Sequence, residues 1–137
     1  MMSGIGAKNT APELLIRRGL HREGFRFRLH DSRLPGSPDI VFAARRAAVQ
    51  VQGCFWHAHE GCKYFKMPSS RTEFWTAKFE RNRARDERNR LEIGRLGWRL
   101  AVVWECATRH ELDETLHTLA AWLHSDVRSI ELPPGKA

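Results

Sequence analysis

Residues 52–62 read QGCFWHAHEGC and contain two cysteines, two histidines, two aromatic residues and two glycines. Cys54, His59 and Cys62 follow the spacing Cys-x4-His-x2-Cys, and the one remaining cysteine, Cys106, lies far downstream. Zinc takes sulfur and nitrogen ligands in a tetrahedron, and ligands typically two to four residues apart can wrap around one ion. If Cys106 completes the set, the four side chains predict a closed Cys3His zinc site. Such a site is structural, because catalytic zinc keeps one position open for water.

One histidine of this segment is not needed for the metal. His57 stands two residues before His59 and beside Phe55-Trp56. Spacing alone leaves open which histidine is the ligand, since both point to the same side if the segment is extended. The structural alternative to zinc is three buried free cysteines and ordinary histidines, but the density of Cys and His in one short segment favours the metal. The remaining histidine is then available for chemistry.

The composition is that of one globular domain with a large positive charge. The chain has 137 residues, 42% hydrophobic and 28% charged, with 23 Lys and Arg against 16 Asp and Glu and a net charge of +7. This length suffices for one domain with its own core, spanning residues 1–137. Lys and Arg gain affinity for nucleic acid by releasing counterions from phosphates, so the charge fits a polyanionic partner.

The chain carries no sequence signal for a membrane or for secretion. No apolar run approaches the roughly 18 residues of a membrane-spanning helix, and the N-terminus has no signal-peptide pattern. An odd cysteine count without a secretory signal favours metal binding in a reducing compartment over disulfides. We therefore expect a cytoplasmic protein without a membrane partner.

Alternating helix and strand patterns predict a mixed α/β sandwich around one sheet. Thr10 as N-cap, Pro12 in the first turn and Glu13 in the capping-box position start a helix that ends at Gly24. The pattern further predicts strands over 25–29, 39–43, 48–52 and 98–105 and helices over 71–96 and 110–124. Residues 1–9 are expected to form a flexible arm, and residues 128–137 a frayed tail.

Two positions of the predicted sheet meet near the Cys-His segment. Asp39 opens one strand and Val51 ends the next, and Arg45-Arg46 marks the hairpin turn between them. The ends of an antiparallel pair are adjacent, so the carboxylate and the backbone before the Cys-His segment meet in space. Two alternatives stay open from spacing alone. Glu13 fits a capping box as well as a functional site, and the arginine-rich segment 81–90 fits either a solvated helix or a face that follows phosphates.

Six short segments carry a more specific signal, and they read NTAPE (9–13), LPGSPD (34–39), GCFWH (53–57), RTEFW (71–75), GW (97–98) and VWEC (103–106). In content and order they resemble the very-short-patch-repair mismatch endonucleases, over about residues 2–107. The resemblance implies a restriction-endonuclease-like fold, with a central mixed sheet flanked by helices and a structural zinc site. The usual signature of that fold is Pro-Asp followed by (Asp/Glu)-x-Lys on the neighbouring strand. Pro38-Asp39 keeps the first half, and Gln50-Val51-Gln52 departs from the second.

The resemblance implies an enzyme that nicks duplex DNA on the 5′ side of the thymine in a T·G mismatch, such as arises when 5-methylcytosine deaminates. Asp39 would bind catalytic magnesium through its carboxylate and Val51 through its backbone carbonyl. His57 would activate the attacking water, with Glu13 in a supporting role. The implied partners are mismatched duplex DNA, mismatch-repair proteins and a companion cytosine methyltransferase, and the implied protein is a monomer associated with the bacterial nucleoid.

The resemblance also implies which residues hold zinc and which enter the DNA. The zinc ligands would be Cys54, His59, Cys62 and Cys106. Phe55, Trp56 and Trp75 would wedge into the base stack, which opens most easily at a mismatch. Met2 would enter the minor groove from the N-terminal arm. Gln52 stands where relatives often carry His or Asp, and glutamine cannot replace a group that shuttles a proton there.

Two other functions fit the same sequence. One is a restriction-type or structure-selective nuclease with another recognition rule, and the other is a zinc-stabilised DNA-binding module without catalysis. The combination of Asp39 with His57 favours an enzyme over the module. Cleavage of matched and mismatched duplexes separates the two nucleases.

Overall fold

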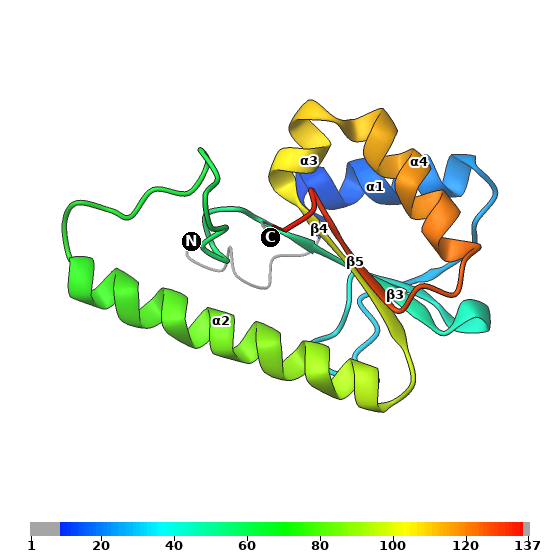
Figure 1. Cartoon of the computed structure of the whole chain (residues 1–137), viewed down its shortest axis with the longest axis horizontal. Coiled ribbons are helices and arrows are strands. Elements are labelled where there is room, and N and C mark those ends of the chain that lie inside the picture. Colours follow the sequence, from blue (N-terminus) through cyan, green and yellow to red (C-terminus); the bar gives the residue numbers. More distant parts are fainter. Residues whose placement is uncertain (1–8, 136–137) are drawn as a thin grey trace.

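A five-stranded sheet forms the centre of the protein, with helices on both faces (Figure 1). The computed structural model describes residues 9–135. In spatial order the strands are β1 (Arg28–Leu29), β2 (Ile40–Phe42), β3 (Ala47–Gln52), β4 (Arg99–Trp104) and β5 (Ser129–Leu132). The pairs β1–β2 and β2–β3 are antiparallel, while β3–β4 and β4–β5 are parallel. The predicted mixed α/β fold is therefore confirmed.

The helices divide unequally between the two faces of the sheet. They are α1 (Ala11–Arg22), α2 (Thr72–Arg95), α3 (Glu105–His110) and α4 (Leu112–Leu123). Figure 1 shows α1, α3 and α4 together over one face and the long α2 running past the other. None of the described helices is both long enough and apolar enough to cross a membrane.

Alternation along the strands splits the core into two clusters. Val49 and Val103 pack with α1 and α4, whereas Ala48 and Val102 pack with Ile93 of α2. Successive side chains of a strand point to opposite faces, so the central strands are buried on both sides and read as continuous apolar runs. Because α2 is polar along most of its length, it covers its face only in part and leaves room for a cavity.

Two predicted segments are wrong, and one helix was not predicted. The strand predicted over 25–29 contains only two paired residues, because Phe25 and Phe27 turn into the core and leave the ladder. Helix α3 was not predicted. The prediction of a frayed tail is wrong over Ser129–Leu132. This segment pairs with β4, so the backbone groups on that edge of β4 are hydrogen-bonded. Residues 1–8, with most of the predicted arm and Met2, and residues 136–137 lie outside the described part of the chain.

Candidate active site and metal centre

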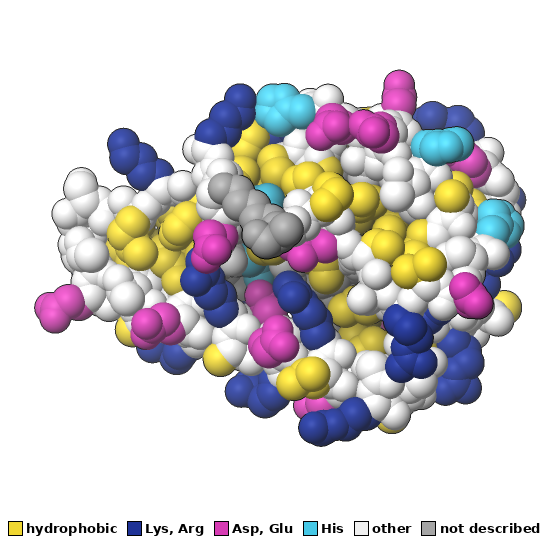
Figure 2. Space-filling model, in the orientation of Figure 1, with side chains coloured by type: hydrophobic (Ala, Val, Ile, Leu, Met, Phe, Trp, Pro, Cys, Tyr) yellow, Lys and Arg dark blue, Asp and Glu magenta, His cyan; other side chains and the backbone are white. Residues whose placement is uncertain are grey.

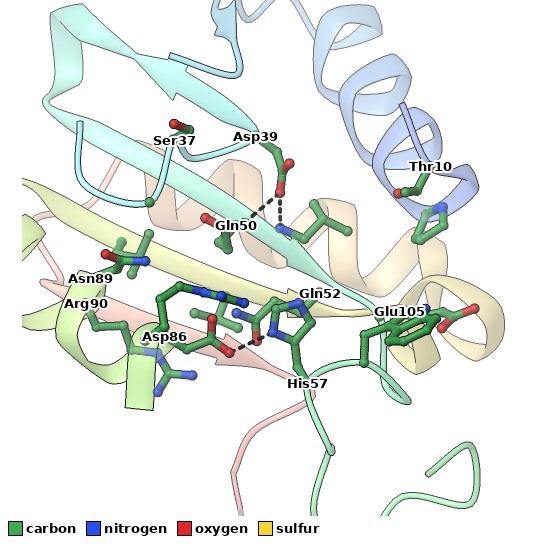
Figure 3. Close-up of a pocket in the computed structure, with 18 of the residues that line it drawn as sticks. Thr10, Ser37, Asp39, Gln50, Gln52, His57, Asp86, Asn89, Arg90 and Glu105 are labelled. Carbon is green, nitrogen blue, oxygen red and sulfur yellow. Dashed lines mark hydrogen bonds and ion pairs between the residues drawn. The ribbon is translucent and has the colours of Figure 1, made fainter. Parts of the chain in front are cut away.

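A cavity of about 640 Å³ lies between α2 and the ends of β2 and β3 (Figure 3). The sheet contributes Asp39 and Gln50, and the loop after β3 contributes His57. The opposite wall is α2, which contributes Asp86 and Arg90. The cavity thus brings together the Asp39 and His57 that the sequence singled out.

Asp39 is held at the mouth of the β2–β3 hairpin. Its Oδ2 accepts a hydrogen bond of 2.7 Å from the Val51 N–H and one of 3.2 Å from Nε2 of Gln50. Only 9% of the residue is exposed, and burial raises the pKa of the Asp39 carboxyl from 3.8 to about 6. The predicted meeting of Asp39 with the end of β3 is confirmed.

The backbone carbonyl of Val51 points toward the same carboxylate. In an antiparallel ladder the N–H and C=O of one residue face the same neighbour, and the Val51 N–H already faces Asp39. Ile40 pairs with Val49, so continuing this register by two residues puts Pro38 opposite Val51. Proline has no N–H to donate. The Val51 carbonyl therefore accepts no hydrogen bond from Pro38 and lies next to a carboxylate oxygen.

Glu13 lies on the other side of Asp39, together with His30. Glu13 is 1% exposed, and its Oε2 lies 2.7 Å from Nε2 of His30 and 3.0 Å from Nη1 of Arg17. Its Oε1 accepts a hydrogen bond of 3.1 Å from the Asn9 N–H. In a capping box this carboxylate would accept from the N–H of the N-cap residue Thr10, so Glu13 binds one residue earlier in the chain. The ligand atoms of Glu13, His30 and Asp39 lie within 4.8 Å of one another.

The sequence reading missed His30. The pairing register of β1 with β2 could have identified it. Leu29 pairs with Ile40, so the next pair outward is His30 with Asp39. The His30 N–H donates to the Asp39 carbonyl at 3.0 Å. His30 has a φ of +48°, a left-handed conformation that a side chain with a Cβ adopts at a cost. Strained residues of this kind concentrate at functional sites.

His57 and His59 have different polar partners. The segment between β3 and α2 turns at Ala58, which has a φ of +50°. Both rings lie near Trp104, but Nδ1 of His59 lies 3.6 Å from Sγ of Cys106, on the side of the cysteines. Nδ1 of His57 lies 2.7 Å from Oδ2 of Asp86 on α2. If Nδ1 carries the proton toward this carboxylate, Nε2 is left with a free lone pair and can act as a base. The sequence reading missed Asp86, which stands within the arginine-rich segment of the helix.

If the site nicks DNA as the resemblance implies, we expect Asp86→Asn to lower the nicking rate roughly 10²- to 10⁴-fold, as when a histidine loses the carboxylate that fixes its tautomer. Asparagine has the same shape, but it carries no charge to stabilise the imidazolium. Single-turnover nicking of a mismatched duplex measures the effect. Glu80→Gln is the matched control, because Glu80 is exposed on the same helix and does not line the cavity. Equal rates in the two variants would show that Asp86 does not act on His57.

The second cluster is the predicted metal centre. The ligand atoms of Cys54, His59, Cys62 and Cys106 lie within 4.8 Å of one another, so this Cys3His group could hold a metal ion. The parallel pairing of Gln52 with Trp104 brings Cys54 and Cys106 together across 52 positions of sequence. The Cys106 N–H donates to Sγ of Cys54 at 3.4 Å.

The surroundings of the cluster suit a thiolate metal centre. His59 stacks on Trp104, with ring centroids 4.0 Å apart and planes 6° from parallel. Burial lowers the pKa of His59, which favours the neutral imidazole that a metal requires. Burial raises the pKa of the Cys54 and Cys106 thiols in the metal-free protein. Metal binding therefore has to displace thiol protons, and the site is expected to weaken in acid.

The three predicted DNA-binding aromatics form one group at the start of α2. Phe55 lies 5.1 Å from Trp56 and 5.6 Å from Trp75 between ring centroids, and Phe79 packs beneath at 5.3 Å from Phe55. Phe74 is 42% exposed beside them. Figure 2 shows hydrophobic side chains gathered on the surface at this end of the molecule. Trp56 also lines the cavity that contains Asp39, so the aromatic group borders the candidate active site.

The mixed sheet, with a buried carboxylate at the open end of a hairpin and a histidine–carboxylate pair opposite, fits the restriction-endonuclease-like fold that the resemblance implies. Comparison with known proteins agrees. The family model described as DNA mismatch endonuclease Vsr matches residues 1–63. The chain is 51% identical over 106 residues to the type II nicking enzyme V.XorIIP of Xanthomonas oryzae pv. oryzae, covering 77% of each protein.

Two further relatives support the same family. The DNA mismatch endonuclease Vsr of Escherichia coli is 39% identical over 135 residues, which cover 96% of this chain and 86% of that protein. The type II nicking enzyme V.NmeAIP of Neisseria meningitidis is 40% identical over 111 residues, covering 81% and 79%. The chain belongs to the Vsr family of DNA mismatch endonucleases. It is a DNA endonuclease, and its substrate is DNA.

Proposed function

We propose that the protein nicks duplex DNA on the 5′ side of the thymine in a T·G mismatch, with magnesium as the catalytic metal and zinc in a structural role. The observation that carries the proposal is the position of Trp56. Its indole lines the same cavity as Asp39 and His57, and it belongs to the aromatic group with Phe55 and Trp75. A base step opened by these rings lies beside the group that cuts.

The groups around Asp39 fit magnesium. This ion prefers oxygen ligands, keeps several waters and needs only one or two carboxylates besides the substrate phosphates. Asp39 offers a carboxylate oxygen, and Val51 offers a carbonyl that Pro38 cannot engage. When bound, magnesium would polarise the scissile phosphate and neutralise charge on the leaving oxygen.

The protein side chains supply the proton transfer. In the proposed reaction Nε2 of His57 takes a proton from the attacking water, whose oxygen bonds to phosphorus as the bond to the leaving sugar oxygen breaks. Asp86 stabilises the imidazolium that forms. Glu13 and His30 support Asp39 from the opposite side. Gln52, which is 3% exposed, cannot replace a titrating group in this chemistry.

The aromatic group supplies the preference for a mismatch. Unpairing and unstacking cost least where the bases are already mispaired. An aromatic wedge therefore inserts more easily at a mismatch than into matched duplex. The metal centre holds the loop that carries Phe55, Trp56 and His57, because its ligands Cys54 and His59 flank these residues. Mismatch-repair proteins and a companion cytosine methyltransferase follow as partners from this function, and both remain predictions.

A second candidate is a nicking enzyme with another recognition rule. It is favoured by the relatives named type II nicking enzymes, whose names associate them with restriction systems. The catalytic residues would be the same, and only the preferred duplex would differ. A DNA-binding module without catalysis is disfavoured by the family and by the pairing of His57 with Asp86 in the cavity of Asp39.

We expect the unmodified protein to nick a T·G duplex and to leave the matched duplex intact. Trp56→Ala should lower the T·G nicking rate roughly 5- to 150-fold, because one stacking contact is worth about 1–3 kcal/mol. Nicking of end-labelled duplexes with and without the mismatch measures both effects. Trp98→Ala, in the turn that follows the other end of α2, is the control. Equal nicking of the two duplexes by the unmodified protein would favour the second candidate.

A further inference from the structure

The cavity is rich in negative charge for a site that must admit a phosphodiester. Asp39, Asp86 and Glu105 all line it. Glu105 is paired with Arg109 at 2.9 Å, and Asp86 with His57 at 2.7 Å. A phosphate placed between these carboxylates is repelled unless cations face it at close range. On the sheet side that cation is a metal at Asp39, and the α2 side needs a cation of its own.

Two arginines of α2, Arg85 and Arg90, line this cavity. Arg85 already donates to Asn82, whereas Arg90 has a buried Nε without an acceptor among the described residues, so Arg90 is the better placed for this task. It stands four residues after Asp86, so both project from one face of the helix. Figure 3 shows Asp86 and Arg90 on the α2 wall, across the cavity from Asp39. One helical face therefore presents both the partner of His57 and a positive charge to the same space.

The donors of Arg90 are largely unused within the described chain. Its nearest carboxylate is Glu87, at 4.0 Å, and its buried Nε has no acceptor among residues 9–135. By contrast, Arg83 donates to the Ala58 carbonyl at 2.7 Å and Arg85 donates to Asn82 at 3.0 Å. A half-buried guanidinium whose N–H groups lack acceptors is stabilised when a ligand supplies acceptor atoms. Phosphate oxygens match the fork of donors on a guanidinium.

We propose that Arg90 binds a non-bridging oxygen of the scissile phosphate and stabilises the charge that develops there during cleavage. The inference rests on the proposed nuclease function and adds a catalytic contact from α2 to it. The guanidinium binds the phosphate on the side facing α2, while Asp39 and Val51 act on the side facing the sheet. His57 delivers the water between the two walls.

The test compares Arg90→Ala with Arg88→Ala in single-turnover nicking at saturating mismatched duplex. Arg88 is exposed on the same helix and does not line the cavity. Arg90→Ala should lower the rate roughly 10²- to 10³-fold, as removal of one preorganised donor to a transition-state oxyanion does. Arg88→Ala should stay within about threefold of the parent rate, since surface cations act mainly on binding. Arg90→Lys should recover part of the loss by restoring the charge.

Duplex affinity and thermal stability of each variant complete the test. DNA affinity of Arg90→Ala should fall far less than the rate, because the contact strengthens in the transition state. A rate equal to that of Arg88→Ala, or a loss confined to affinity, overturns the inference. A parent protein that nicks matched and mismatched duplexes equally overturns the T·G proposal and still allows the two arginine variants to be compared. A parent that nicks no duplex overturns both.

Discussion

Cys106→Ser is expected to yield a chain that holds no zinc and does not fold stably. Structural zinc contributes apparent binding energies of about 10–16 kcal/mol to small zinc modules, whereas a whole domain is stable by only about 5–15 kcal/mol. Cys106 closes the ligand group formed with Cys54, His59 and Cys62. Serine has the same connectivity as cysteine and is slightly smaller, but it is not a thiolate, so three ligands remain in a site that needs four.

Elemental analysis and thermal unfolding measure this result. The parent should contain one zinc per chain, and prolonged treatment with a strong chelator should lower its unfolding temperature toward that of Cys106→Ser. Thr108→Ser is the control on the same helix, because serine retains the hydroxyl that donates to the Glu105 carbonyl at 2.7 Å. A Cys106→Ser protein with full zinc content and the parent unfolding temperature would disprove a structural metal at this cluster.

Asp39→Asn is expected to abolish nicking and, at the same time, to make the metal-free active site more stable at pH 8. The amide removes the charge that holds magnesium, so the rate should fall by more than roughly 10³-fold while DNA binding survives. The amide oxygen can still accept from the Val51 N–H. Binding and catalysis are thereby separated at one residue.

The stability effect follows from the raised pKa of Asp39. Its carboxyl has a pKa of about 6 in the folded chain against 3.8 as the ordinary value, because burial disfavours the charged form. Between these values the folded state binds more protons than the unfolded state, so stability falls as pH rises through this window. At pH 8 the full cost is present, at most about 3 kcal/mol, and Asn does not incur it.

Urea unfolding at pH 8, 6 and 5 in buffer without magnesium checks the sign. Asp39→Asn should exceed the parent in unfolding free energy at pH 8, and the difference should shrink as pH falls toward 4. Nicking by the parent should also decline below about pH 6, as protonation of the buried carboxyl competes with the cation. If the parent were more stable than Asp39→Asn at pH 8, ionisation of Asp39 would not lower the unfolding free energy, and the prediction would be wrong.

Groups that are close in the chain could be predicted from the sequence. The Cys-x4-His-x2-Cys spacing brings three of the four metal ligands into one segment, and any compact turn keeps them within reach of one ion. The short hairpin between Asp39 and Val51 likewise leaves little freedom, since an antiparallel pair joined by a tight turn has one register that buries its apolar residues. The capped start at Thr10 was local too, and its side chain accepts from the Glu13 N–H at 3.4 Å.

Groups that meet across long stretches of sequence were decided by the tertiary structure. Asp86 is 29 residues from His57, and its role depends on the rotation of the whole of α2, which charge patterning along a polar helix does not specify. Arg90 depends on the same rotation, and β5 on a parallel pairing with β4 that no turn encodes. Local spacing in this chain determined three of the four candidate ligands of the Cys3His cluster. The packing of α2 against the sheet decided which charges face the reacting phosphate, because a long helix acquires its orientation from what it buries and not from its own residues alone.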